Sequence, residues 1–388
     1  MSLFLHLILP FCVAFLMVLC AYPKVLKVAQ MKGIVDNPDA RKLQKRPVPV
    51  LGGVAVFFGL TFGFIMAMVV TDCSSLFPVF VAMTVMLCVG TLDDIVDLSP
   101  LLRFAVEVVV VTAMVLASGC SINDFHGLFG YGLIPMWFAL PLTVFAAVGI
   151  INAINLIDGV DGLSSGYCVM FCVMFCVMFY RVGHVSMVIL AAVGAGAVIP
   201  FFFHNVFGRD SKMFIGDGGT LLIGTLMATF VLQVLRTQSP AAQLYDGRIG
   251  LIPFTLAVLS IPVFDTLRVM TARILRGHSP FRPDKTHLHH IFLDLGFSHP
   301  AIFVAILTLN CSVVLAWWAL AAYGYSINTQ LYVVVALALF STFGLYGFLA
   351  YHIANNTRFS LLMRRLAAAT HVERKGFFLW LRQVVDRI

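Results

Sequence analysis

Stretches of about 20 mostly apolar residues recur along the chain, and they constrain its fold more than any other feature. A helix that spans a membrane needs roughly 20 such residues. Charged residues make up 11% of the chain, against about 25% in soluble domains. We therefore predict an all-α polytopic integral membrane protein with about 11 transmembrane helices. The predicted spans are 2–22, 50–70, 76–92, 103–119, 133–151, 163–180, 185–203, 219–236, 249–271, 301–322 and 330–351.

The basic residues fall on alternate loops, and this predicts the orientation. Of the 25 Lys and Arg residues, 22 lie in segments 23–49, 93–103, 204–218 and 268–290 and in the tail from 352. Because cytoplasmic loops carry an excess of Lys and Arg, we expect the N-terminus outside and the C-terminus in the cytoplasm. The domains predicted are a membrane-embedded domain (1–351) and a basic amphipathic cytoplasmic tail (352–388). The net charge of +7 suits anionic lipids and phosphorylated substrates, so no nucleic acid partner is needed to explain it.

The segment from Asn152 to Gly166 is unusually polar for a chain that otherwise avoids charge. It holds two amides, Asn152 and Asn155, and two carboxylates, Asp158 and Asp161, separated by glycines. Ionisable groups at the membrane are costly, which makes them candidates for function. Helical spacing places Asn152, Asn155 and Asp158 on one face, and amides recognise imide edges or hydroxyls. Hydrogen bonding between helices is the structural alternative.

Three further groups are predicted to lie on the same cytoplasmic side. Asp93 and Asp94 close one apolar stretch, Asp217 lies among glycines before another, and a basic loop contains His287, His289 and His290. Helix capping, an ion pair between Asp93 and Arg103, or plain surface histidines are the alternatives. Carboxylates on a basic face suggest a divalent cation held between them and phosphate, as Mg²⁺ is commonly bound. Zinc is less favoured because a fourth ligand is missing from the pattern.

In this order, the motifs resemble those of the polyprenyl-phosphate N-acetylhexosamine-1-phosphate transferases, a glycosyltransferase family 4 (MraY–WecA–TagO) superfamily. The match runs from about Asp36 to Gly296. Leu288 interrupts the histidine run, where the MraY type typically has three consecutive histidines. This favours the WecA/TagO-like branch.

The resemblance implies transfer of an N-acetylhexosamine-1-phosphate, with GlcNAc-1-phosphate favoured, from a UDP-sugar to undecaprenyl phosphate. The products would be polyprenyl-diphospho-sugar and UMP, in the first membrane step of a cell-envelope glycan pathway in the bacterial inner membrane. It implies a Mg²⁺ cofactor, with Mn²⁺ as an alternative ion. UDP-N-acetylhexosamine, the polyprenyl phosphate lipid and the membrane would be the partners, and a homodimer is left open.

Roles in the family carry over to matching residues of this chain. Asp93, Asp94 and Asp217 would be catalytic, and Asp94 and Asp217 would be the carboxylates on the metal side. Asp93 corresponds to the proposed base for the lipid phosphate, although that phosphate is already largely ionised at neutral pH. The residues expected to bind substrate are Lys45, Asn152, Asn155, Asp158, Asp161, Asn205, Arg282, His287, His289 and His290.

Other functions remain open on the sequence. The same chemistry with UDP-MurNAc-pentapeptide or UDP-GalNAc is one alternative. A CDP-alcohol phosphotransferase is disfavoured because no Ala-Arg follows Asp161-Gly162 at the required spacing. A transporter of an anionic substrate would place polar breaks near the membrane midplane, whereas here they gather at helix ends.

Overall fold

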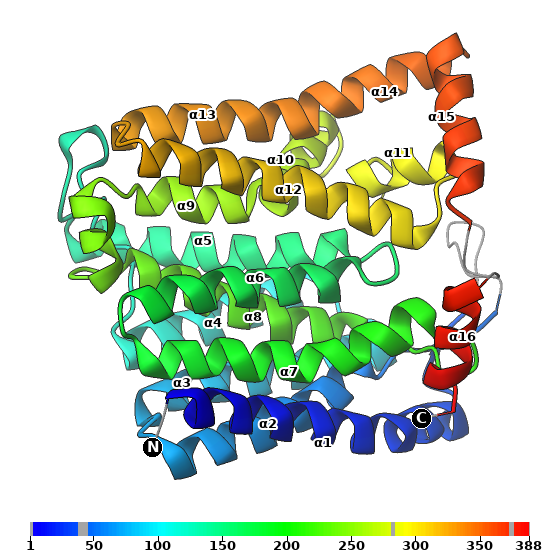
Figure 1. Ribbon diagram of the computed structural model, residues 1–388, viewed down its shortest axis with the longest axis horizontal. Coiled ribbons are helices and arrows are strands. Elements are labelled where there is room, and N and C mark those ends of the chain that lie inside the picture. Colours follow the sequence, from blue (N-terminus) through cyan, green and yellow to red (C-terminus); the bar gives the residue numbers. More distant parts are fainter. Residues whose placement is uncertain (1–2, 38–45, 281–283, 372–375, 388) are drawn as a thin grey trace.

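A computed structural model describes residues 3–37, 46–280, 284–371 and 376–387 as a helical bundle (Figure 1). The helices of the first half are α1 (Leu3–Lys32), α2 (Gly52–Val70), α3 (Phe77–Val96), α4 (Pro100–Ser118), α5 (Met136–Ile157), α6 (Leu163–Arg181), α7 (Val185–Phe207) and α8 (Gly216–Leu235). Those of the second half are α9 (Leu251–Val258), α10 (Ser260–Leu275), α11 (Leu288–Asp294), α12 (His299–Ala322), α13 (Ile327–Leu339), α14 (Leu345–Ala354), α15 (Arg358–Ala369) and α16 (Gly376–Val385). The short elements are strands β1 (Val35–Asp36) and β2 (Val48–Pro49), which pair antiparallel, the 3₁₀ turns η1 (Ser74–Leu76), η2 (Leu128–Gly130) and η3 (Pro240–Gly247), and the π-helical turn η4 (Phe340–Gly344).

The multi-pass membrane architecture predicted from the sequence is confirmed. Within the described residues, ten helices are long and apolar enough to span a membrane, and the bent pair α9 and α10 makes an eleventh. The N-terminal end of α1 and the C-terminus lie at opposite ends of the bundle (Figure 1). That arrangement agrees with an odd number of spans. Which end faces the cytoplasm stays a prediction.

The predicted span 249–271 is wrong as a single continuous helix. It breaks at Leu259 into α9 and α10, which are bent by 73°. Pro262 explains the break, because a proline ring clashes with the carbonyl four residues earlier, here that of Val258. Asn310 takes up this freed carbonyl, with its Nδ2 donating over 3.0 Å, and the Tyr167 hydroxyl donates to it as well. In a membrane such a carbonyl needs a partner within the protein.

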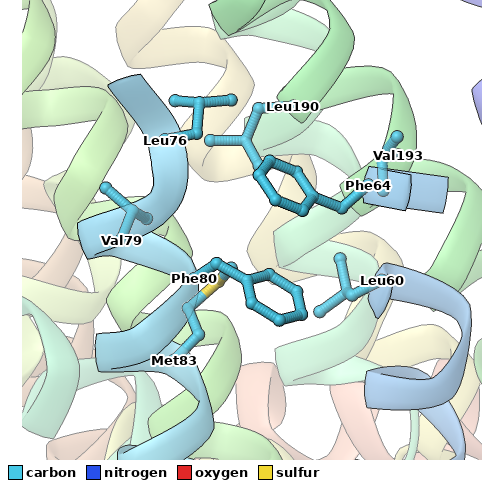
Figure 2. A pocket seen from close by; sticks show the side chains of 8 residues that line it. All are labelled: Leu60, Phe64, Leu76, Val79, Phe80, Met83, Leu190 and Val193. Atoms are coloured by element: carbon cyan, nitrogen blue, oxygen red, sulfur yellow. The ribbon is translucent and has the colours of Figure 1, made fainter. Parts of the chain in front are cut away.

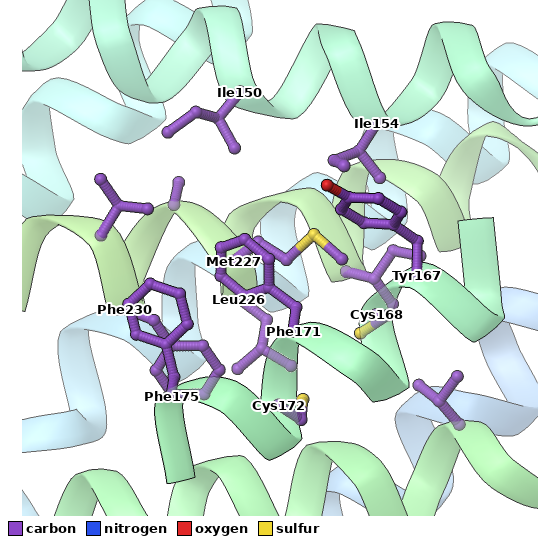
Figure 3. Close-up of a cluster of buried hydrophobic side chains, with 14 of the residues drawn as sticks. Ile150, Ile154, Tyr167, Cys168, Phe171, Cys172, Phe175, Leu226, Met227 and Phe230 are labelled. Atoms are coloured by element: carbon purple, nitrogen blue, oxygen red, sulfur yellow. The ribbon is translucent and has the colours of Figure 1, made fainter. Parts of the chain in front are cut away.

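Helix α8 is the centre of the bundle. Every residue from Gly218 to Leu235 is buried, with α2, α3, α5 and α6 packed against the helix. The hydroxyls of Thr225 and Thr229 donate to carbonyls four residues earlier in the same helix, so they need no outside partner. On one side, Phe171 and Phe175 of α6 meet Phe230 of α8, as Figure 3 shows.

The three cysteines Cys168, Cys172 and Cys176 recur every four residues on α6. Cys168 and Cys172 are buried among the aromatic side chains of Figure 3. Across the described residues, no group of three or more His, Cys, Asp or Glu side chains is arranged to hold a metal. Buried among these rings, Cys168 and Cys172 pack as small residues of this helix.

Figure 2 shows an apolar void of about 10 Å³ between α2, α3 and α7. Phe64, Phe80 and Leu190 are among the side chains that line it. It is a small dry packing gap, since a water needs polar partners as well as space. A nucleotide sugar does not fit there.

Glycines bring α8 close to its neighbours. A Cβ on Gly53 of α2 would lie 2.4 Å from the Cα of Gly219, and one on Gly90 of α3 would lie 2.5 Å from the Cα of Gly218. The backbone beside them is also joined, because the Gly52 and Gly53 amides donate to the carbonyls of Phe214 and Ile215. Small residues let membrane helices approach closely in this way. The start of α8 is thereby fixed against α2 and α3.

Gly53→Ala is expected to destabilise the protein by roughly 1–3 kcal/mol, because the added methyl forces α2 and α8 apart. The same substitution at Gly149 is the control, since a Cβ there meets nothing within 4 Å among the described residues. Thermal unfolding in detergent would measure both. A Gly53→Ala melting temperature equal to that of Gly149→Ala would contradict this account of the packing.

Candidate active site

The predicted site residues gather at one end of the bundle, which we call the site end. It comprises the end of α3, the start of α8, and the segments 97–99, 158–162, 208–215, 276–280 and 284–287 that join helices there. Helices α11, α15 and α16 lie at the same end, with α15 and α16 running across the helix axes (Figure 1). Lys45 and Arg282, which the sequence predicts as substrate contacts, fall outside the described residues.

Asp94 holds the start of α8. Its Oδ1 accepts from the amide of Asp217 over 2.9 Å, and its Oδ2 accepts from the amide of Gly218 over 3.2 Å. The chain can turn into α8 so sharply because Gly216 has a φ of +74°, where a side chain would be strained and would also meet Asp94. Two acceptor positions remain on a carboxylate bound in this way, so Asp94 keeps lone pairs for a cation.

Asp217 joins α8 to α5. Its Oδ1 accepts from Asn155 Nδ2 over 2.6 Å, and the same Nδ2 lies 2.7 Å from the hydroxyl of Thr220. The second oxygen, Oδ2, lies 3.6 Å from Arg103 Nη1, and 37% of the Asp217 side chain is exposed. Asp217 therefore presents one loosely held carboxylate oxygen toward the outside of the bundle.

Arg103 of α4 links three carboxylates. Its Nη1 donates to Asp93 Oδ2 over 3.0 Å, and its Nε lies 3.6 Å from Glu107, in addition to the contact with Asp217. Glu107 is completely buried and accepts from Asn152 Nδ2. Arg103 and Glu107 thus connect the Asp93–Asp94 pair with the amides of α5.

Glu107 is not among the site residues predicted from the sequence, and Arg103 is named there only as a partner of Asp93. The sequence carries a signal for both, because two opposite charges spaced i, i+4 within an apolar stretch are neighbours on a helix. Asp93 forms the ion pair with Arg103 that was the structural alternative at the sequence level, and its Oδ1 also accepts from the amide of Leu98 over 2.7 Å.

Beyond α5, the two aspartates of the 158–162 segment differ in their surroundings. Asp158 is exposed and accepts from the hydroxyl of Ser164. Asp161 is nearly buried, and its Oδ2 lies 2.5 Å from Lys212 Nζ and 2.6 Å from His299 Nδ1. Burial raises the pKa of Asp161, but these two groups outweigh it and hold that pKa below its usual value. Asp161 is therefore ionised and tied to the α7–α8 connection.

Asn205 is buried beside this segment and joins two loops. Its Oδ1 accepts from the amide of Gly162 over 2.6 Å, and its Nδ2 donates to the carbonyl of Met213 over 3.0 Å. These bonds fix the 158–162 segment to the connection that precedes α8. A direct contact between Asn205 and substrate stays a prediction.

The predicted histidine loop is partly helical, since His289 and His290 lie on α11 and His287 directly precedes it, and His289 reaches the 158–162 segment. A Cβ on Gly159 would lie 2.2 Å from His289 Nε2, so the ring is in close contact with that glycine. The rings of His287 and His289 are parallel, with centroids 5.7 Å apart, and the His290 ring lies 4.3 Å from that of His289. Nearby, Arg273 binds Asp284 with two hydrogen bonds of 3.0 Å. The structure therefore brings together the groups that the sequence predicted to form one site.

Burial lowers the pKa of His289 well below its usual value, and the neighbouring His290 and His287 lower it further. The unfolded chain therefore binds a proton at this position below about pH 6.5, while the folded protein does not. The contribution of His289 to the free energy of unfolding is therefore fully present above that pH, and it decreases as the pH falls.

We expect His289→Gln to remove this dependence. Between pH 7.5 and pH 5 the wild type should lose up to about 2 kcal/mol that the variant retains. Melting temperatures at the two pH values would measure it. His278→Gln, the same change at an exposed histidine of the connection between α10 and α11, is the control and should behave as the wild type. Parallel pH profiles for wild type and His289→Gln would contradict this.

The carboxylates at the start of α8 suit Mg²⁺. Mg²⁺ commonly takes one or two carboxylates together with substrate phosphates and water. Asp217 offers a partly exposed oxygen without a close hydrogen-bond donor, and Asp94 retains free lone pairs beside it. These carboxylates therefore fit a hard divalent ion whose remaining ligands would come from the substrate and water.

Comparison with known proteins identifies the same family that the sequence motifs resemble. The family described as "Glycosyl transferase family 4" matches residues 76–235. An undecaprenyl-phosphate alpha-N-acetylglucosaminyl 1-phosphate transferase of Yersinia pestis is 34% identical over 285 residues, covering 72% of this chain and 75% of that protein.

Two further relatives extend the match. The protein of the same description from Escherichia coli K12 is 29% identical, over 82% of this chain and 84% of its own. A probable undecaprenyl-phosphate N-acetylglucosaminyl 1-phosphate transferase of Bacillus subtilis is 31% identical over 76% of this chain and 79% of its own. With the membrane fold and the clustered carboxylates, these similarities establish that the chain belongs to glycosyl transferase family 4, as a polyprenyl-phosphate N-acetylhexosamine-1-phosphate transferase of the WecA/TagO-like branch.

Proposed function

We propose that this protein transfers GlcNAc-1-phosphate from UDP-GlcNAc to undecaprenyl phosphate, as the first membrane step of a cell-envelope glycan pathway. The supporting observation is the linked set of Asp93, Arg103, Asp217 and Asn155 at the site end, where α3, α4, α5 and α8 meet. The relatives described above carry the same activity in their names. The identity of the sugar that this protein transfers is part of the proposal.

In the proposed reaction an oxygen of the lipid phosphate attacks the β-phosphorus of the UDP-sugar. A new P–O bond forms, the bond from the β-phosphorus to the bridging oxygen breaks, and UMP leaves with that oxygen. Such phosphoryl transfers depend mainly on positioning and on stabilisation of charge. The lipid phosphate, with a second pKa near 6, is largely ionised at neutral pH and needs no strong base.

The residues divide this work according to their contacts. Asp217 and Asp94 would hold Mg²⁺, which when bound neutralises charge on the diphosphate. Arg103 contributes a fixed positive charge between Asp93 and Asp217, where it stabilises phosphate oxygens. Asp93 has both oxygens occupied by Leu98 and Arg103, so we assign it to orienting Arg103 and the acceptor. This favours direct attack by the lipid over a two-step route through an aspartyl nucleophile.

The nucleotide would bind along α5 and the segment that follows it. Asn152 and Asn155 are already engaged by Glu107 and Asp217, so they orient these carboxylates as well as offering amide oxygens. Asp158 is exposed there and free to accept from a ligand N–H or O–H. His289 and His290, with Lys45 and Arg282 outside the described residues, would lie near phosphates or sugar.

We expect Asp158→Asn to weaken UDP-GlcNAc binding by about tenfold, the effect of one lost charge-assisted hydrogen bond. Isothermal titration would measure it. Asp210→Asn, a change at an exposed aspartate of the α7–α8 connection, serves as the control. Equal affinities for wild type and Asp158→Asn would place the nucleotide elsewhere.

The site end is proposed to face the cytoplasm of a bacterial inner membrane. It carries the loops that hold most of the Lys and Arg residues. Helices α15 and α16 lie across this end and expose Leu361, Leu366, Phe377 and Trp380. With the arginines between them, these helices suit the membrane interface, as expected of the predicted tail 352–388.

Product analysis would test the choice of sugar. The purified protein would receive undecaprenyl phosphate, Mg²⁺ and, in separate reactions, UDP-GlcNAc, UDP-GalNAc or UDP-MurNAc-pentapeptide. Mass spectrometry of the lipid fraction should show undecaprenyl-diphospho-GlcNAc. A lipid product from only one of the other donors would overturn the sugar assignment while keeping the reaction class.

A further inference from the structure

Asp265 of α10 is a buried carboxylate that connects the broken span with the histidine loop. It is 2% exposed. Its Oδ1 accepts from Arg268 Nε and Nη2 over 3.1 and 2.7 Å, and its Oδ2 lies 2.9 Å from His287 Nδ1. Both oxygens also lie within 3.2 Å of the amide of Leu288. From the sequence, Asp265 and Arg268 would be expected to form only a structural pair.

These contacts determine where the proton of His287 lies. An ionised carboxylate only accepts hydrogen bonds, so the Nδ1 of His287 must carry the hydrogen. Arg268 already neutralises the carboxylate, is itself buried, and has its guanidinium 3.7 Å from the centre of the Tyr346 ring. A second positive charge on His287 would be buried without a counter-ion, which is costly. The ring is therefore neutral, and its Nε2 carries a lone pair.

The Nε2 of His287 is buried, and within the described part of the chain it has no hydrogen-bond partner. The ring cannot turn over to place a carbon there without losing the hydrogen bond between its Nδ1 and Asp265. Buried polar atoms without partners are rare and cost stability. The His287 ring lies parallel to that of His289, which itself touches the 158–162 segment of the site end. A partner that arrives with the substrate explains why it is retained.

We propose that Asp265 is a positioning residue, which fixes His287 in the Nδ1–H tautomer and so presents Nε2 as an acceptor to an N–H or O–H group of the UDP-sugar. The inference rests on the proposed function for the identity of that ligand. This role excludes a phosphate oxygen as the partner of His287 Nε2, because such an oxygen offers no hydrogen to this lone pair. A carboxylate that accepts from one ring nitrogen of a histidine commonly fixes its tautomer in this way.

The tautomer can be measured without any activity. The full chain, with ¹⁵N in its histidine rings, would be studied by NMR in lipid nanodiscs, and His287→Gln would identify the His287 signals. At pH 7.5 the wild type should show a protonated Nδ1 and an unprotonated Nε2. A protonated Nε2, alone or together with Nδ1, would overturn the proposal on the wild type alone.

Two variants sharpen the measurement. Asp265→Asn should abolish the fixed Nδ1–H state of His287. Asp284→Asn is the matched control, because it removes another arginine-bound carboxylate, one in the connection before His287 that does not contact a histidine in the described hydrogen bonds. It should leave the His287 signals unchanged. A well-folded Asp265→Asn protein with an unaltered tautomer would contradict the positioning role.

Ligand binding separates this inference from the proposed function. Asp265→Asn should weaken UDP-GlcNAc binding by about tenfold, and comparison with UDP shows whether the sugar or the nucleotide supplies the donor group. Unchanged affinity for both ligands in the folded variant would overturn the acceptor role. If the wild type released no UMP from any donor, the proposed function would fail while the tautomer result stood. Normal UMP release with a protonated Nε2 would overturn only the role of Asp265.

Discussion

Replacing Asp217 by Asn is expected to lower turnover by roughly 10²- to 10³-fold, the scale seen when one preorganised electrostatic group is removed from an active site. The change keeps the shape of the side chain and the contact with Asn155 can re-form through the amide oxygen. It removes the negative charge that would hold Mg²⁺ beside the diphosphate. The initial rate of UMP release at saturating Mg²⁺ would measure the effect.

The control for this substitution is Asp72→Asn. Asp72 lies between α2 and η1, at the end of the bundle opposite the site, and accepts from the amide of Ser74 over 2.9 Å. That variant should turn over at nearly the wild-type rate. Near-normal turnover of the folded Asp217→Asn variant would show that Asp217 does not hold Mg²⁺. It would also contradict the proposed role of α8 in positioning that carboxylate.

Arg103→Ala is the second change with a large expected effect, a loss of about 10²-fold or more in turnover. It leaves Asp93, Glu107 and Asp217 without the cation that they share, and it removes a positive charge from beside the phosphates. Arg103→Lys should recover only part of the activity, because an ammonium group lacks the planar fork that contacts several carboxylates at once.

Kinetics of the two Arg103 variants would be compared with those of Arg181→Ala. Arg181 ends α6 at the opposite end of the bundle and is exposed, so its loss changes the net charge equally without touching the site. Equal activities of Arg103→Ala and Arg181→Ala would show that Arg103 acts only in packing. Full activity of Arg103→Lys would show that charge alone suffices.

The membrane architecture was predictable because it rests on properties that the sequence displays directly. Spanning helices need long apolar stretches, so the span 163–180 and the span 185–203 were separable even though Arg181 and His184 are the only polar residues between them. The structure confirms them as α6 and α7. The break between α9 and α10 was missed, although Pro262 carries its signal. Apolarity alone cannot distinguish a continuous helix from a bent one whose freed carbonyl is satisfied by Asn310.

The sequence predicts which residues form the site better than it predicts which residues contact one another. Aspartates and histidines stand out in an apolar chain, so Asp94, Asp217 and His289 were identified as candidates. Their partners depend on which helices meet in space. The contact of Asn155 with Asp217 spans 62 positions, and the link from Asp265 to His287 depends on the bend at Leu259. The roles of these residues in catalysis stay predictions until they are tested.

The most direct test of the account is UMP release by the purified protein in the presence of undecaprenyl phosphate, UDP-GlcNAc and Mg²⁺. The account predicts UMP formation that needs all three components and stops when the metal is chelated. UMP formation without the lipid, or none under any combination that includes the lipid and Mg²⁺, would contradict the transfer of GlcNAc-1-phosphate at this site.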